Sequence, residues 1–219
     1  MASVHRAAPI LFVAISLGAS LAGCRTETVH LDLSAADDIS VSARSLRKPA
    51  SPVAVLSVAW RPIEDRRLDR KLLGHIGPQA YVAESILPWI DRQLGAIHGP
   101  DLIIVNNPAK ADVVITPYLL KFYLQSIDVT KSAVVVLALK FEPSGQPAQE
   151  RIYRGQYAGM NWSDSDEEMI GALRAAFSDC LHHIVTDLET QAQLKAANEL
   201  SSLTAAGSGT PPTTAPPQK

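Results

Sequence analysis

The most regular alternation of apolar and polar positions lies toward the C-terminal end of the chain. Apolar side chains recur there every three or four residues, as on one face of an α-helix. They are Ile170, Leu173, Phe177, Cys180, Leu181, Ile184 and Leu188. The preceding Ser165-Asp166-Glu167-Glu168 matches a capping box, in which the Ser165 hydroxyl and the Glu168 carboxylate satisfy free backbone amides. The pattern predicts a helix from Ser165 with Phe177 buried and His182 outside.

Runs of β-branched and apolar residues predict strands. Residues 53–60 are nearly continuous in apolar character, which is typical of a strand covered on both faces. Further strands are expected at 102–105, 112–125, 132–141 and 151–160, with a hairpin loop at 142–147. Pro117 suggests a bulge or an edge position, because proline cannot donate a backbone hydrogen bond.

Between the first two strands the pattern predicts one long helix. Val82, Ile86, Ile90, Leu94 and Ile97 recur at helical spacing, which indicates a helix over residues 79–97. Pro88 should kink or split it. Residues 61–70 are charged and irregular, and the glycine-bearing stretch 72–78 is expected to be a flexible connection.

These elements predict an α/β fold with two layers, a mixed β-sheet and two main helices packed on the same side of it. The domain is expected to span residues 53–200. Residues 24–52 are polar and serine-rich and are expected to form a flexible linker of about 30 Å reach. Residues 201–219, almost only Ser, Thr, Ala, Gly and Pro, predict a disordered tail.

The N-terminus has the pattern of a secretory signal. An apolar run over residues 7–22 follows His5 and Arg6, and it is too short to span a bilayer comfortably. Leu21-Ala22-Gly23-Cys24 closes the run and resembles the lipobox of a bacterial lipoprotein. Residues 1–23 are therefore predicted to be a signal peptide, with Cys24 as the lipidated first residue of the mature protein. An ordinary cleaved signal and an uncleaved membrane helix are the alternatives.

Lipidation of Cys24 would make the membrane a permanent partner, since several acyl chains are needed for stable anchoring. It would also leave Cys180 as a lone thiol, which is expected to be a core residue on the apolar helix face. Arg25 follows Cys24, where inner-membrane lipoproteins of enteric bacteria carry an aspartate. The resemblance thus implies an outer-membrane anchor and a domain that faces the periplasm.

Charge excludes one class of partner. The formal net charge is −2, and it becomes −3 when Arg6 leaves with the signal peptide. A nucleic-acid binder would show a basic face instead, so no nucleic-acid partner is expected.

The residues that could carry chemistry form no catalytic or metal-binding constellation in the sequence. His182 and His183 are adjacent and would point about 100° apart on a helix, and His183 with Asp187 is typical of an exposed pair. Ser57 lacks a nucleophile-elbow context, and Gly74-His75-Ile76-Gly77 lacks the residues of a phosphate loop. The acidic cluster Asp164, Asp166, Glu167 and Glu168 complements a helix N-terminus. We therefore expect no enzyme activity, no metal and no cofactor.

The lipobox, the order of elements and the Ala111-Asp112-Val113-Val114-Ile115 strand opening resemble small envelope lipoproteins. These are the YajG-like, transport-auxiliary and penicillin-binding-protein-activator types, whose domain is related to the N-terminal domain of TolB. The resemblance implies a non-enzymatic adaptor or accessory subunit of an envelope assembly or transport complex, with an envelope protein as partner. The alternative is a periplasmic carrier that holds an apolar ligand, such as a lipid, between the helices and the sheet.

Overall fold

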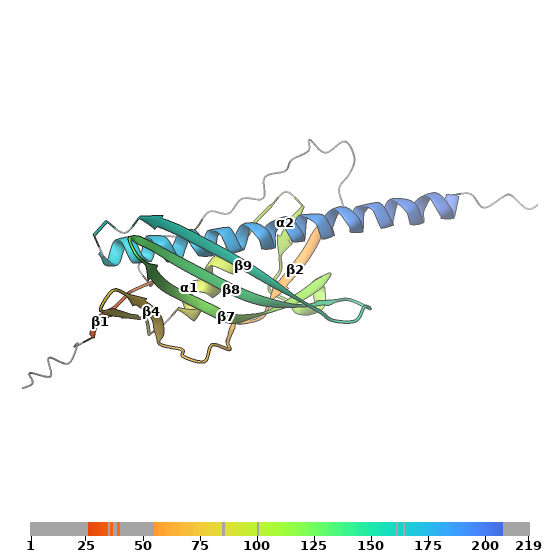
Figure 1. Cartoon of the computed structure of the whole chain (residues 1–219). Helices are drawn as coiled ribbons and strands as arrows, with labels where there is room; N and C mark the ends of the chain where they lie inside the picture. Colours follow the sequence, from red (N-terminus) through yellow and green to blue (C-terminus); the bar gives the residue numbers. More distant parts are fainter. Residues whose placement is uncertain are drawn as a thin grey trace, which may run out of the picture.

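The computed structural model describes residues 26–34, 36, 39, 55–84, 86–99, 101–160, 162–163 and 165–207, with the side chains of the last helix described as far as Ser202. A mixed sheet of nine strands and two α-helices on one of its faces make up this part of the chain (Figure 1), so the predicted two-layer α/β fold is confirmed. The elements are β1 (Glu27–His30), β2 (Leu56–Trp60), β3 (Glu64–Asp65), β4 (Leu72–Ile76), β5 (Gln79–Val82), α1 (Leu87–Gly95), β6 (Leu102–Ile104), a 3₁₀ turn η1 (Pro108–Lys110), β7 (Val113–Ile127), β8 (Thr130–Pro143), β9 (Gln149–Met160) and α2 (Asp166–Gly207).

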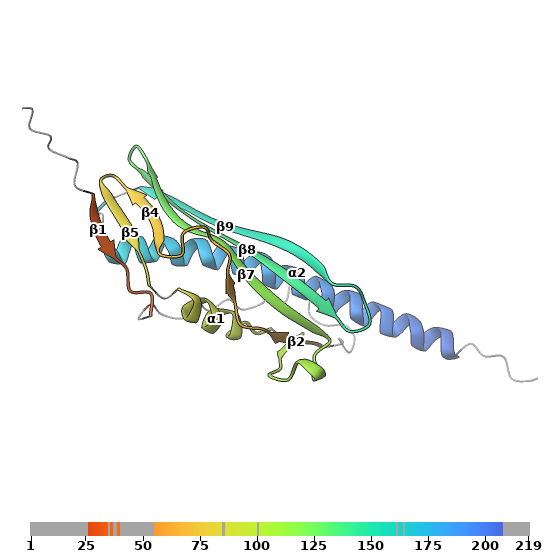
Figure 2. The same cartoon turned by 90° about the horizontal axis from the view of Figure 1, so that it is seen from below.

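Three long strands form one side of the sheet, with β9 at its edge. β7, β8 and β9 follow one another as an antiparallel meander, as the sequence predicts. The other edge of β7 pairs in succession with β2, β3 and β4, all parallel to it. β6 then extends the sheet beyond β2, while β5 and β1 extend it beyond β4 (Figure 2).

Pro117 lies in the middle of the sheet, and the register shift of β7 falls at Leu119/Lys121 instead. Backbone carbonyls two residues to either side of Pro117 accept hydrogen bonds from Arg61 and Arg66, which follow β2 and β3. The nitrogen of Pro117 therefore points at the gap between these two strands, where no donor is required. A central strand tolerates proline here because its partner changes at this point.

The long helix predicted over residues 79–97 is wrong in its first half. Residues 72–82 form the hairpin β4–β5, and α1 starts only at Leu87, with Pro88 in its first turn where a missing amide costs nothing. Gly74 has φ +127°, and a Cβ there would lie 1.9 Å from the Leu124 carbonyl oxygen. The glycine that suggested a flexible connection instead permits close approach of β4 to β7.

The domain begins earlier than the predicted boundary at residue 53. β1 pairs with β5 over Glu27–His30, and Leu31 and Leu33 are buried in the core. The polar composition of this segment concealed a strand because only its end contributes apolar side chains. The first part of the predicted flexible linker is thus part of the sheet, and the remainder lies largely outside the described residues.

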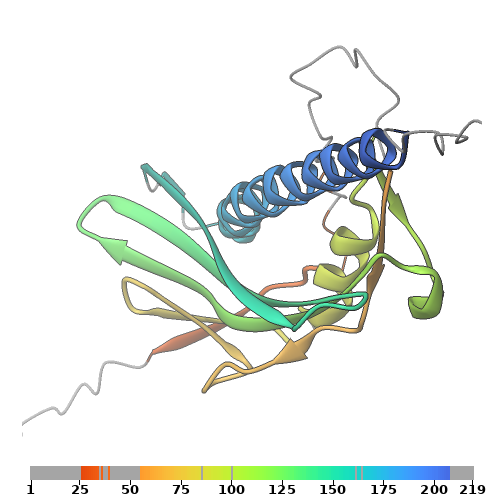
Figure 3. The ribbon, with the colours of Figure 1, turned by 90° about the vertical axis from the view of Figure 1, so that its right-hand side faces the viewer.

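The core lies between the helices and the sheet (Figure 3). Trp89 of α1 packs against Phe177 of α2 with ring centroids 4.9 Å apart, and against Phe122 of β7 at 6.2 Å. Cys180, predicted to be a core residue, is fully buried. α2 passes so close to β9 at Gly155 that a Cβ there would lie 2.0 Å from the Ala176 carbonyl oxygen.

The helix α2 begins where the sequence predicts, but it ends later. The Ser165 hydroxyl accepts from the Glu168 amide at 3.3 Å, as in a capping box. The Glu168 carboxylate accepts instead from the Trp162 and Ser163 amides. The helix continues to Gly207, so the first residues of the predicted disordered tail are helical. Within the described residues, neither helix is long and apolar enough to cross a membrane.

Candidate functional site

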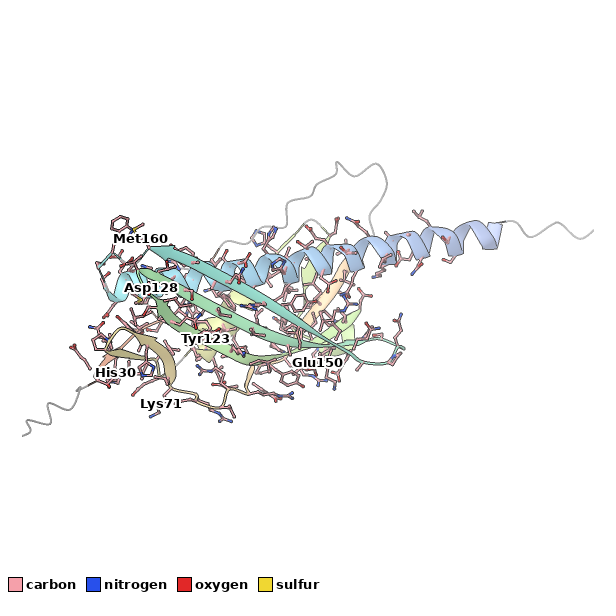
Figure 4. The ribbon with its side chains drawn as sticks, viewed as in Figure 1. His30, Lys71, Tyr123, Asp128, Glu150 and Met160 are labelled. Atoms are coloured by element: carbon pink, nitrogen blue, oxygen red, sulfur yellow. The ribbon has the colours of Figure 1, made fainter. Side chains whose placement is uncertain are left out.

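A pocket of about 440 Å³ lies where α2 leaves the sheet. It is near the β8–β9 hairpin, at the end of the molecule that Glu150 marks in Figure 4. Its walls come from α2, from the hairpin and from the starts of β2 and β7. The lining residues are Leu56, Asp112, Val113, Phe141, Pro143, Ser144, Gln146, Gln149, Arg151, Gln191, Leu194, Lys195, Asn198 and Glu199. The pocket is thus mixed in character, with charges of both signs.

One side of the pocket is closed by a hydrogen-bonded cluster of Ser57, Asp112 and Lys195. Lys195 Nζ lies 2.8 Å from Asp112 Oδ2 and donates to the Val55 carbonyl oxygen at 3.0 Å. The Ser57 amide and hydroxyl donate to the same carboxylate oxygen at 2.8 and 2.6 Å. The cluster joins α2 to the ends of β2 and β7.

The electrostatics of this cluster favour a structural role. Burial alone acts to raise the pKa of Asp112, but the hydrogen bonds from Lys195 and Ser57 outweigh it and hold this pKa below the ordinary aspartate value. Asp112 Oδ2 thereby accepts hydrogen bonds from Ser57 of β2 and from Lys195 of α2 at the same time. The arrangement can hold α2 in place and can offer hydrogen bonds to a partner.

A second polar cluster, Arg151, Tyr153 and Asp187, ties α2 to β9. Arg151 Nη1 donates to both oxygens of Asp187, at 2.7 and 2.6 Å, and the Tyr153 hydroxyl donates to Asp187 as well. Burial, and then the bond to Asp187, raises the pKa of Tyr153. The expected pairing of His183 with Asp187 does not form, because Asp187 binds Arg151 and Tyr153 of β9. His183 Nε2 lies 3.8 Å from Asp179 Oδ1 instead.

The cysteine and histidine candidates are in different surroundings. Cys24 lies outside the described residues, so the structure does not test its lipidation. Burial raises the pKa of Cys180 to about 12, which keeps it a protonated thiol. His182 and His183 are exposed on α2. Among the described residues, no group of three or more His, Cys, Asp or Glu side chains is placed to hold a metal ion.

The acidic cluster lies at the start of α2, as expected, with Asp166, Glu167 and Glu168 in the first turn. Asp164 lies outside the described residues. Glu168 forms an ion pair with Lys131 of β8, so it also fixes the helix start to the sheet. Gly77, the second glycine of the rejected phosphate loop, occupies the β4–β5 turn with φ +55°.

The pocket was missed by sequence reasoning because its residues are far apart in the chain. Asp112 and Lys195 are separated by 83 positions. One signal was present: Leu188, Ala192 and Lys195 continue the spacing of the buried face of α2, so Lys195 was placed to reach the sheet. No local pattern could have shown which acid it would meet.

Removing the Lys195 contact is expected to loosen the end of α2 without unfolding the domain. Lys195→Ala should speed hydrogen exchange of the amides after Ala192 severalfold, while global stability changes by less than about 1 kcal/mol because the pair is partly exposed. Gln193→Ala is the matched control, because Gln193 is exposed and lies in the same turn of α2 as Lys195. Unchanged exchange in Lys195→Ala would show that other contacts hold this part of the helix.

Beyond the pocket, α2 extends past the edge of the domain (Figure 1). As far as Ser202, where the described side chains of α2 end, Ala192 is its last buried residue, whereas Leu194 is 59% and Leu200 48% exposed. The helix from there to Gly207 is roughly 22 Å long at 1.5 Å per residue. We call residues 193–207 the projecting helix.

No protein-family model and no curated protein matches the chain. Several solved structures are similar to this chain in fold. A Xanthomonas campestris protein of the DUF330 family is 13% identical, with a TM-score of 0.46, over 80% of this chain and 99% of that one. A Chlamydia trachomatis protein is 10% identical, with a TM-score of 0.40, over 64% and 96%. A lipoprotein from Neisseria meningitidis is 10% identical, with a TM-score of 0.27, over 62% and 99%. With TM-scores below 0.5, the proposals that follow rest on the geometry of this chain.

Proposed function

We propose that this protein is a lipid-anchored, non-enzymatic accessory subunit of the bacterial cell envelope, which engages a partner protein through the projecting helix and the pocket at its base. The observation that carries the proposal is the continuation of α2 past Ala192, the last buried residue among its described side chains. A membrane anchor at one end of the chain and an exposed helix at the other suit an adaptor.

An isolated helix of this length is marginally stable in water, because most helical stability in proteins comes from packing. The projecting helix nevertheless carries apolar side chains, among them the exposed Leu194 and Leu200. Two charged residues, Lys195 and Glu199, are the ionisable groups of this segment. A partner that covers the apolar side chains would stabilise the helix and bury surface that is otherwise in contact with water.

The pocket adds polar groups to the surface of the projecting helix, and these groups can select a partner. Lys195 and Glu199 of α2 and Arg151 of β9 line it. A partner segment laid against the helix could place its own polar groups there, where fixed hydrogen-bonding groups discriminate between partners. We accordingly propose a protein partner, no cofactor and no catalytic role.

The alternative function, transport of an apolar ligand between helices and sheet, has less support. That space holds the packed rings of Trp89, Phe122 and Phe177, all fully buried. Native mass spectrometry of the gently purified protein separates the two functions. A stoichiometric lipid would favour the carrier, and a co-purifying envelope protein would favour the adaptor.

The anchor is tested by metabolic labelling. Wild-type protein should incorporate labelled palmitate, and Cys24→Ala should not, because the thiol of Cys24 takes the lipid. Cys180→Ala is the matched control and should still be labelled, since Cys180 is buried in the core. Label that survives in Cys24→Ala would contradict the proposed anchor and the outer-membrane location that depends on it.

The partner is tested by cross-linking in cells. A photoreactive amino acid at Leu200 should give a discrete adduct with an envelope protein. The same group at His182, exposed on the outer side of α2 over the domain, should not. If Leu200 gives no adduct, or the same adducts as His182, the projecting helix is not the partner-binding surface.

A further inference from the structure

One end of the sheet gathers four chain segments that are distant in sequence. The β4–β5 turn at Gly77 lies beside β7, because the Gly77 amide donates to the Ser126 hydroxyl at 3.3 Å. The β7–β8 turn contains Asp128, with φ +53°, and Thr130 after it pairs with Met160 at the end of β9. β1 starts at the same level, because Glu27 pairs with Gln79. We call this the turn end. Figure 4 shows Asp128 and Met160 there, with Glu150 at the opposite end of the long strands.

The turn end exposes large apolar side chains on its β7–β9 side. Ile127 is 65% and Val129 69% exposed, on either side of Asp128. Met160, the last residue of β9, is 53% exposed, and Trp162, two positions later, is 80% exposed. Grouped apolar side chains on the surface of a soluble domain indicate a contact with another molecule or a membrane.

Trp162 is held in this position. The Glu168 carboxylate accepts from the Trp162 amide at 3.2 Å and from the Ser163 amide at 3.0 Å. The same carboxylate pairs with Lys131 of β8. The amides of Trp162 and Ser163 are thereby linked through Glu168 to both α2 and the sheet.

The start of β1 is close in sequence to the predicted lipidation site. Thr26 is the first described residue, and Cys24 is two positions before it. Two residues span at most about 7 Å, so the chain can place Cys24 no farther than that from Thr26, the residue before β1. A lipid on Cys24 would therefore hold the turn end, and no other end, against the membrane.

We propose that Ile127, Val129, Met160 and Trp162 insert into the interface of a phospholipid membrane and, with the lipid of Cys24, stand the domain upright on the bilayer. This rests on the proposed function for the anchor. Glu27 and Met160 lie at opposite edges of the turn end, five strand spacings or roughly 24 Å apart. Contacts at both edges fix the tilt of the domain, and tryptophan suits the interface because its ring is amphipathic.

The nearby charges specify the kind of membrane surface. Glu27, Asp128, Asp166 and Glu167 are acidic and exposed at or next to the turn end. They would repel anionic headgroups, so the contact depends on the apolar side chains and favours a zwitterionic surface. α2 starts at this end and is about 63 Å long, so its projecting part would be carried far from the membrane.

The test uses the full lipidated protein reconstituted in phosphatidylcholine vesicles, some with acyl chains brominated to quench tryptophan on contact. The Trp162 signal is the difference between wild-type protein and Trp162→Phe. Brominated lipid should quench it at least twofold more than it quenches the remaining Trp60 and Trp89. Ile127→Ser should reduce the quenching at least twofold, and Ile152→Ser, equally exposed at 66% but far along β9, should not.

Each outcome decides between the possibilities. Protein that floats with the vesicles while Trp162 stays unquenched overturns the inference and leaves the anchor intact. Protein that does not associate with vesicles, together with absent palmitate label, overturns both. A blue shift of Trp162 without quenching, accompanied by dimers on cross-linking, assigns the turn end to a second copy. Quenching that appears only with anionic lipid overturns the zwitterionic preference.

Discussion

Phe177→Ala is expected to lower the free energy of unfolding by about 3–5 kcal/mol, the usual cost of truncating a buried phenylalanine. Phe177 is fully buried, and its ring lies 4.9 Å from that of Trp89. The truncation would leave a cavity where both helices meet the sheet, so α1 and α2 would lose a shared contact. The melting temperature should fall by roughly 10 °C, and less protein should accumulate in cells.

His182→Ala is the matched control, five positions along the same helix. His182 is exposed, so its removal should change stability by no more than about 0.5 kcal/mol. Thermal unfolding followed by circular dichroism measures both variants. Equal shifts in the two would contradict the buried position of Phe177.

Gly155→Ala is expected to be nearly as damaging, although it adds a single methyl group. The new Cβ would lie 2.0 Å from the Ala176 carbonyl oxygen and 2.3 Å from the Cys180 nitrogen. Both are backbone atoms of α2, which cannot move aside without shifting the helix. We expect a loss at or above the upper end of the usual ~1–3 kcal/mol for overpacking.

Gly171→Ala, in α2 itself, is expected to have the opposite effect on stability. A Cβ at Gly171 meets nothing within 4 Å, and alanine is a better helix former than glycine by roughly 0.5–1 kcal/mol. Chemical denaturation should therefore show Gly171→Ala more stable than wild type and Gly155→Ala much less stable. A harmless Gly155→Ala would mean that α2 does not approach β9 as closely as the structure shows.

The acidic side of the pocket links stability to pH. The pKa of Asp112 is lower in the folded protein than in the unfolded chain, because Lys195 and Ser57 stabilise its charged form. The ionised Asp112 therefore contributes its full stabilisation of the folded state at pH values above the ordinary aspartate pKa. This stabilisation is lost as the pH falls through the lower pKa of Asp112 in the folded protein. When the free energy of unfolding is measured against pH, Asp112→Asn should make it fall less steeply at acid pH than in the wild type. At neutral pH the variant should be less stable than the wild type, because the ion pair with Lys195 is lost.

The sequence predicted α2 and the β7–β9 meander correctly because their patterns are local and long. The stripe through Leu173, Phe177 and Leu181 is unambiguous at helical spacing, and all three are buried. The hairpin β4–β5 failed for the opposite reason. Val82 and Ile86 are spaced as in a helix. Tyr81 between β4 and β1 is nevertheless buried in a strand, and the pattern of neighbouring residues carries no information about these two pairing strands.

The sequence by itself determined the two-layer α/β class and the buried face of α2 with Cys180 within it, while the signal peptide over residues 1–23 and the lipidation of Cys24 stay predictions. These depend on the spacing of neighbouring residues, which the chain carries locally. Only the tertiary structure decided that β1 joins the sheet, that Asp112 meets Lys195 across 83 positions, and that Trp162 lies at the same end of the sheet as the start of β1. Such pairings arise from the packing of whole elements, because register and closest approach are settled only when all strands and helices compete for the same core.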